Sequence, residues 1–116
     1  MIQTLTTPVT DVTGLDTPGG DIHLELRRGR LEVRFAGEID TALRARFDRV
    51  LLVVRAAHEP VEVDCRDVTF FCAEGVRMLM LLQTPAGGPG VTELRSSPWV
   101  DRALRLSGVE RYPNPL

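Results

Sequence analysis

The segment FFCAEGVRML, from Phe70 to Leu79, places a thiol, a carboxylate and a guanidinium close together at Cys72, Glu74 and Arg77. The segment is typical of a strand end that runs directly into an apolar helix. Such a junction exposes backbone N–H groups, and the positive end of the helix dipole favours a thiolate at the first turn. The chemistry to consider is therefore nucleophilic attack by Cys72, or binding of an anion or of a protein partner at the helix start.

Nucleophilic chemistry is disfavoured by the spacing. Cys72, followed by Gly75 and Arg77, is similar to the anion cradle of cysteine phosphatases. Those enzymes place one residue more between their Cys and Arg than the four that separate Cys72 from Arg77, and Phe71 precedes the cysteine here. A shorter loop cannot direct the same N–H groups inward. We therefore expect no catalytic residue and no enzyme, and interpret Cys72 as a small, half-buried side chain at a helix start.

No other set of residues indicates a metal or a cofactor. His23 falls on the polar side of a strand and His58 in a turn, without a cluster spaced for metal ligands. Asp64 and Asp67 fit a turn or a cap at a strand end. The glycine-rich AGGPG segment at residues 86–90 follows a helix rather than preceding one, so it does not fit a phosphate loop.

Composition excludes several classes of protein. The chain has 116 residues, enough for one domain, and 43% hydrophobic with 26% charged residues is ordinary for a soluble globular protein. Net charge is -2 and the fourteen basic residues, all arginine, are scattered, which disfavours binding to nucleic acid or to a membrane surface. No apolar run approaches a membrane span and the N-terminus lacks a leader, so we expect a cytoplasmic protein with Cys65 and Cys72 reduced.

The first half of the chain contains the elements that precede the junction. Residues 1–20 hold six Thr, two Pro and three Gly without periodicity, and we interpret most of them as a flexible tail before a domain over residues 21–116. Alternating apolar residues predict strands over 22–27 and 31–37, joined as a hairpin at Gly29. Apolar residues spaced i, i+4, i+7, i+8 and i+11 then predict a helix from Asp40 to Ala57.

The second half alternates strands and helices. The pattern predicts strands over 61–65 and 91–95, a helix over 73–83, and a helix that begins at the Ser97-Pro98 pair, which has the form of an N-cap followed by proline. One short strand is expected in residues 109–116. The order ββαβαβα(β) indicates an α/β fold: a single domain with a mixed four- to five-stranded sheet and three helices packed on it.

The helix over residues 73–83 is apolar nearly all round, whereas a helix on one face of a sheet needs only a stripe. We expect the surplus at Met78, Leu81 and Leu82. Either neighbouring helices of the same chain or another protein covers it, because exposed apolar patches rimmed by charge are typical contact sites. Glu74 and Arg77 would form that rim.

Three segments in order resemble one family. FAGEID at 35–40 is similar to the GEID/GELD segment of STAS domains, the anti-sigma factor antagonists and their relatives on sulfate transporters. Residues 61–82 resemble the family's central signature of a strand, VTF, a DSSG or DSAG loop and an apolar helix. PWVDRALRLSGVERY at 98–112 resembles its third helix and the exit from it.

The resemblance implies a non-enzymatic switch protein of bacterial transcription regulation. In the family an anti-sigma factor kinase phosphorylates a Ser of the loop, and the unmodified antagonist binds that kinase and releases the sigma factor. The alignment puts Cys72 at the Asp position, a poorer helix cap by roughly 0.5–2 kcal/mol. It puts Ala73 at the phosphoacceptor Ser, and Gly75 keeps its place. Because Ala73 has no oxygen, this site cannot accept phosphate.

Two outcomes of this change stay open from the sequence. Ala73 resembles an unmodified Ser, which would fix the protein in its partner-binding form. Alternatively, Glu74 supplies a permanent negative charge that weakens kinase binding. Thr69 and Ser96 are further hydroxyls to consider as phosphosites.

The expected partner-binding surface comprises Asp40, Cys72, Ala73, Glu74, Gly75, Arg77, Met78 and Leu81. The expected function is a phosphorylation-independent antagonist of an anti-sigma factor. The alternatives are a structural or regulatory subunit of a larger assembly, such as a stress-signalling scaffold or a membrane transporter, and, more remotely, a Cys72-dependent enzyme. Family members also continue past the third helix into a last strand and a last helix, and we expect this chain to lack that last helix. A homodimer or a folded-back tail would cover the surface that this helix leaves bare.

Overall fold

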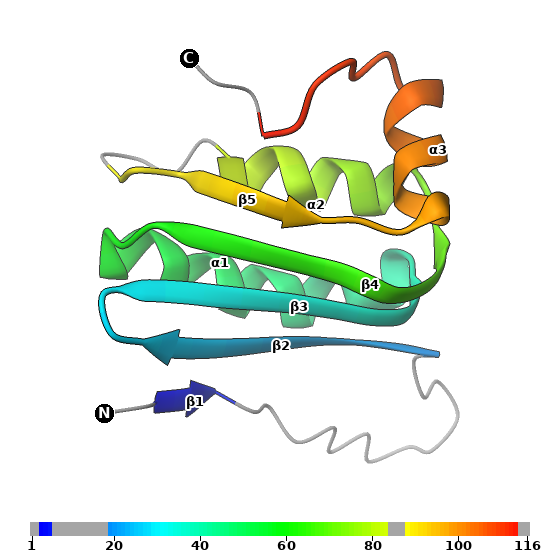
Figure 1. The fold of residues 1–116 in the computed structure, drawn as a ribbon. Coiled ribbons are helices and arrows are strands. Elements are labelled where there is room, and N and C mark those ends of the chain that lie inside the picture. The colour runs from blue at the N-terminus through cyan, green and yellow to red at the C-terminus, as the bar shows by residue number, and fades with distance from the viewer. Residues whose placement is uncertain (1–2, 6–18, 84–87, 114–116) are drawn as a thin grey trace.

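A computed structural model describes residues 3–5, 19–83 and 88–113. Its five-stranded sheet has the order β1-β2-β3-β4-β5, and α1 and α2 lie side by side on one face of it (Figure 1). The pairs β1–β2 and β2–β3 are antiparallel, whereas β3–β4 and β4–β5 are parallel. The predicted mixed α/β sheet with three helices is therefore confirmed.

The hairpin of β2 (Gly20–Arg27) and β3 (Arg30–Ile39) forms as predicted. Gly29 in its turn has φ +76°, a conformation that glycine adopts without a steric penalty. Ile22 and Leu24 pair with Phe35 and Val33, and all four side chains are buried beneath the helices. The alternation of apolar and polar residues thus fixes which face of the hairpin enters the core.

The next strand is longer than predicted. β4 (Val61–Phe71) has eleven residues, whereas the sequence pattern predicted a strand only over 61–65 followed by a connector. Shifts in its register with β3 let this long strand leave strict alternation, so that Val68 and Phe71 are also buried. Asp64 and Asp67 consequently lie inside β4 rather than at a strand end. The carboxylate of Asp64 accepts hydrogen bonds from the backbone N–H and guanidinium of Arg66, which lower its pKa.

Asp40 and Ser97, two polar residues that the sequence predicts as caps, each cap a helical segment. Asp40 Oδ1 accepts from the N–H of Ala42 at 2.9 Å and caps a short 3₁₀ turn, η1 (Thr41–Leu43), which leads into α1 (Arg44–Ala57). α2 (Ala73–Gln83) follows β4, and β5 (Val91–Arg95) then pairs with β4 in parallel. Ser97 caps α3 (Pro98–Leu106), as the Ser-Pro pair predicts.

The two ends of the chain differ from the prediction. β1 (Gln3–Leu5) pairs with β2 although it falls within the expected flexible tail, and Gly20 already belongs to β2. Residues 6–18 lie outside the described part. Residues 109–113 form no strand; instead the Tyr112 hydroxyl donates to the carbonyl of Leu79 at 2.6 Å and ties this segment to α2.

The core lies between the sheet and the helices. Its fully buried side chains come from both the sheet and the helices and include Phe35, Phe47, Leu43, Met78 and Leu79. The other sheet face carries charged side chains, where Arg95 lies within 4.0 Å of carboxylate oxygens of Glu32, Glu62 and Asp64. In the described part of the chain, no helix combines the length and apolar character that crossing a membrane requires.

Candidate functional site

The junction between β4 and α2 lies at the edge of the sheet where β3 also ends. Ile39 and Phe71 are register partners, so Asp40 and Cys72, which follow them, lie next to one another. The parallel pairing brings these two strand ends together, although 32 positions separate the two residues in the chain. The structure therefore places the two predicted helix starts, at Asp40 and at Cys72, side by side.

Cys72 is half-buried, and its Sγ lies 3.4 Å from the carbonyl oxygen of Ile39, to which the thiol donates. This contact points the sulfur back toward β3. The backbone carbonyl of Cys72 accepts a hydrogen bond from the N–H of Val76, which is the first hydrogen bond of α2. The predicted small, half-buried side chain at a helix start matches this position.

Ala73 is exposed at the first position of α2, whereas Gly75 is buried two residues later. A Cβ on Gly75 would lie 2.6 Å from Cζ of the Phe71 ring. The ring is itself buried and packs edge-on against Phe35. Glycine is thus required here by close packing, and it lets α2 start directly above the end of β4 with Ala73 turned to solvent.

Glu74 is buried and fully engaged, unlike the exposed rim residue that the sequence predicts. One carboxylate oxygen accepts from Arg44 at the start of α1, and the other accepts from Arg77 on α2, each at 2.7 Å. The hydrogen bond from Arg44 contributes most to lowering the pKa of Glu74, against the opposing effect of burial. Two guanidinium groups therefore neutralise this carboxylate, while their own side chains stay half exposed.

The exposed face of α2 is narrower than predicted. Met78 and Leu82 are fully buried and Leu81 is half-buried, because helices and sheet of the same chain cover them. Of the two coverings that the sequence left open, the same chain covers Met78 and Leu82, so Met78 lies in the core. The residues that share the outer face are Ala73, Arg77 and Met80, spaced i, i+4 and i+7, and the last is 37% exposed. Sequence reasoning missed Met80, although this spacing from Ala73 marks it.

The two alternative hydroxyls differ in their surroundings. Thr69 is exposed on β4. Ser96 is half-buried, and its Oγ lies 2.6 Å from Oδ1 of Asp101, so a phosphate there would meet a carboxylate. Electrostatics therefore disfavours Ser96 as a phosphosite.

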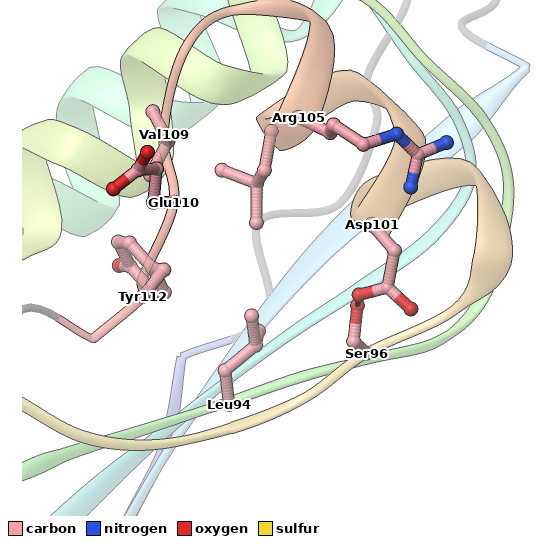
Figure 2. Close-up of a pocket in the computed structure, with 8 residues that line it drawn as sticks. Leu94, Ser96, Asp101, Arg105, Val109, Glu110 and Tyr112 are labelled. Carbon is pink, nitrogen blue, oxygen red and sulfur yellow. Dashed lines mark hydrogen bonds between the residues drawn. The ribbon is translucent and has the colours of Figure 1, made fainter.

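A hollow beside α3 was not predicted from the sequence. It measures about 580 Å³ and lies between β5, α3 and the segment that follows α3 (Figure 2). Leu94 and Ser96 form one side, Asp101 and Arg105 come from α3, and Tyr112 faces them from the C-terminal segment. The hollow depends on how three consecutive segments, residues 94–96, α3 and residues 109–112, fold against one another, so no local pattern indicates it.

Cys65, the second cysteine, is fully buried in β4, and burial raises the pKa of its thiol to about 12. Among residues 19–83 and 88–113, no three His, Cys, Asp or Glu side chains gather as metal ligands. The distinctive site is thus the β4–α2 junction, where an exposed methyl group precedes a carboxylate that two arginines neutralise.

Comparison with solved structures finds the same fold in anti-sigma factor antagonists. The crystal structure of such an antagonist from Mycobacterium paratuberculosis matches with a TM-score of 0.67 and 21% identity, over 95% of this chain and 92% of the other. The antagonist SpoIIAA in its unphosphorylated form matches with a TM-score of 0.56 and 20% identity, over 77% of this chain and 82% of the other. A search of curated proteins found no match.

The family model described as "Mlab, STAS domain" matches residues 22–116, nearly everything from β2 onward. The fold shared with the two antagonist structures agrees with that assignment. The chain belongs to the STAS domain family.

Proposed function

We propose that this STAS domain is a bacterial, cytoplasmic regulator that acts by binding another protein through the β4–α2 junction. Its partner is an anti-sigma factor kinase, which it binds as an antagonist without being phosphorylated at the usual loop position. The proposal is supported by the fold shared with two anti-sigma factor antagonists and by the exposed helix start at Ala73. No cofactor is involved.

The observation that carries the proposal is the electrostatic state of the junction. Ala73 presents a methyl group where the family resemblance puts a serine, and Glu74 beside it is buried between Arg44 and Arg77. A neutralised carboxylate cannot repel a partner as a phosphate of about -1.5 to -2 charges would. The junction therefore favours the permanently binding-competent form over the form in which Glu74 imitates phosphate.

The docking surface proposed here consists of Asp40, Cys72, Ala73 and Arg77, with Met80 added. Glu74 and Gly75 act within it as positioning residues, because they fix the two helix starts and the close approach to Phe71. Leu81 contributes at its margin. Met78 is enclosed by the core and supports the helix from below.

Charge substitutions at matched alanines test the docking surface. Purified protein is immobilised, the co-purifying ATP-binding kinase is identified from cell extract, and its affinity is then measured for the variants Ala73→Glu and Ala56→Glu. We expect Ala73→Glu to weaken binding about tenfold or more, which is about 1.4 kcal/mol. Ala56 is another exposed alanine, on α1, so its variant should stay within about twofold of wild type. Equal affinity of Ala73→Glu and wild type would exclude the junction as the docking site.

The missing hydroxyl gives a second test. With the same kinase and radiolabelled ATP, wild-type protein should remain unlabelled and Ala73→Ser should become labelled, because only the variant carries an acceptor oxygen at an exposed helix start. Labelling of wild type would locate a phosphosite elsewhere, with Thr69 the first residue to substitute. An unlabelled Ala73→Ser variant in a stable complex with an active kinase would contradict the assigned acceptor position.

A second candidate is a structural or regulatory subunit of a larger assembly, such as a signalling scaffold or a membrane transporter. The match to the family model described as "Mlab, STAS domain", rather than to an antagonist, favours it. In that case the captured proteins would be subunits of the assembly and not a kinase. Turnover of a phosphate ester that disappears in Cys72→Ser would instead support the more remote thiol-dependent enzyme.

A further inference from the structure

A second, apolar hollow of about 310 Å³ lies between the end of β4 and α3. In Figure 1, α3 lies at the end of the sheet where β4 runs into α2. We call this hollow the aromatic groove. Phe70, Phe71, Trp99, Arg102, Ala103 and Leu106 line it. It shares no residue with the hollow between β5, α3 and the C-terminal segment, because the two draw on different residues of α3.

The aromatic groove gathers large apolar side chains that remain in water. Phe70 is 45%, Trp99 51% and Leu106 73% exposed. Single exposed apolar residues are ordinary, but three around one hollow form a patch of the kind that binds another protein. Aromatic residues, tryptophan above all, commonly dominate the binding energy of such contacts.

The exposed apolar side chains of α3 form a second stripe on the helix, separate from the stripe that packs into the core. Val100 and Leu104 are buried beneath α3. Trp99, Ala103 and Leu106, spaced i, i+4 and i+7, follow a separate flank of the same helix and face the aromatic groove. One stripe anchors the helix to the domain, whereas Trp99 and Leu106 at the two ends of the other stripe remain exposed and only Ala103 between them packs against the core.

Charge indicates what the aromatic groove accepts. Arg102 lies between Trp99 and Leu106 on this flank and makes no ion pair with any residue in the described part of the chain. Its guanidinium therefore suits a carboxylate from outside the molecule. Glutamate or aspartate beside an aliphatic or aromatic side chain would satisfy both the cation and the apolar lining.

A second copy of this chain is a poor occupant. In a twofold dimer the same patch meets itself, so Arg102, in the middle of the flank, would approach its own symmetry mate. Two guanidinium groups without counter-ions would then be desolvated at the centre of the contact, which is unfavourable. The occupant should therefore be a different chain with an acidic surface.

We propose that the aromatic groove binds an amphipathic, acidic helix of the partner protein, with an apolar anchor side chain against Trp99 and Leu106 and a carboxylate on Arg102. This inference rests on the proposed function for the identity of the partner. Because Phe70 and Phe71 directly precede Cys72 and Ala73, the groove extends the docking surface along α3. The partner would then contact α2 and α3 together.

The single tryptophan of the chain, Trp99, gives a direct readout. The probe is a peptide of about three helical turns without Trp or Tyr, with Leu at i, i+3, i+4 and i+7 and Glu elsewhere. Titration of the full chain should shift the Trp99 emission to the blue and saturate. A peptide with Lys in place of Glu should bind about tenfold more weakly or not at all.

Matched variants separate the groove from the rest of the surface. Leu106→Ser and Arg102→Glu should each weaken binding of the Glu peptide about tenfold. Leu52→Ser is the control, because Leu52 on α1 is similarly exposed at 67% and lies outside the groove. No saturable shift with the Glu peptide, equal binding of both peptides, or a blue shift that depends on the concentration of the protein alone would each overturn the proposal.

The outcomes for the groove and for the proposed function are distinguishable. The Ala73→Glu variant should bind the Glu peptide within about twofold of wild type, since Ala73 is not part of the groove lining. If the Glu peptide binds but no kinase is captured, the proposal for the aromatic groove is supported and the proposed function is contradicted. A kinase that binds Leu106→Ser and Arg102→Glu as tightly as wild type would remove the groove from the docking surface and leave the proposed function intact.

Discussion

At the scale of single residues, Glu74 shows how burial changes the meaning of a charge. The sequence places a carboxylate next to the residue at the phosphoacceptor position, which suggests an imitation of phosphate. The structure turns that carboxylate inward to Arg44 and Arg77, so its charge connects α1 to α2. Sequence cannot predict this, because Arg44 is 30 positions away and the contact depends on how the two helices pack.

The paired state of Glu74 predicts a dependence of stability on pH. Its folded pKa is lowered, so its contribution is present above the unfolded value of about 4.3 and is lost as pH falls through the folded pKa. Glu74→Gln should lower the free energy of unfolding by about 1 kcal/mol at pH 7, a modest amount because both arginines are half exposed. Urea denaturation at pH 7 and near pH 3 measures this. The difference from wild type should shrink in acid; a difference that is the same at both pH values would contradict the ion-pair interpretation.

The two cysteines should react differently with thiol reagents. Burial raises the pKa of Cys65 to about 12, and its side chain has no exposed surface. We therefore expect Cys65 to remain unmodified by Ellman's reagent in the folded protein at pH 8. Its rate of modification should equal the rate at which the protein unfolds. Mass spectrometry of the Cys72→Ser variant, in which Cys65 is the remaining thiol, isolates this reaction. Rapid modification of the folded variant would show that β4 opens locally.

At the scale of elements, local signals predicted helices and turns better than strands. The Ser97-Pro98 cap, the Asp40 cap and Gly29 each act over a few residues, and each lies where the sequence predicts. β4 was predicted too short because its second half departs from strict alternation where it shifts register against β3. β1 was not predicted because its three residues are too few to show a strand pattern, and the strand is defined by its pairing with β2.

The contact between Gly75 and the Phe71 ring predicts a steric coupling between β4 and α2. Gly75→Ala should destabilise the protein by about 1–3 kcal/mol despite the better helix propensity of alanine, because the added Cβ meets a buried ring at 2.6 Å. Thermal unfolding measures the change. In a Phe71→Leu background the same substitution should cost at least about 1 kcal/mol less. Equal costs in both backgrounds would show that the ring does not cause the clash.

At the scale of the whole molecule, all helices between parallel strands cross on one face, which leaves the other face charged and the two sheet edges unequal. β1 pairs with the edge of β2, whereas β5 forms the opposite edge. An edge strand with unpaired backbone groups is open to pairing with another chain, so β1 protects one side of the sheet. The pairing of Gln3–Leu5 with Leu24–Leu26 covers part of this edge of β2.

Removal of residues 1–5 tests this role. The β2 amides that face β1 should exchange with solvent deuterium faster, whereas those that pair with β3 should keep their protection. Sedimentation of the shortened chain should show more self-association if the exposed edge pairs with a second copy. Unchanged exchange along β2 would show that β1 contributes no protection in solution.

The position of β1 also has a practical consequence. Gln3 is opposite Leu26, beside the hairpin turn, at the end of the sheet remote from Ile39 and Phe71. A carrier protein or a surface tether attached ahead of β1 would therefore stand off from Ala73 and the aromatic groove by the length of the sheet. Such a tether leaves Ala73 and the aromatic groove accessible to a binding protein. The amino-terminal side is therefore the better attachment point for capture experiments.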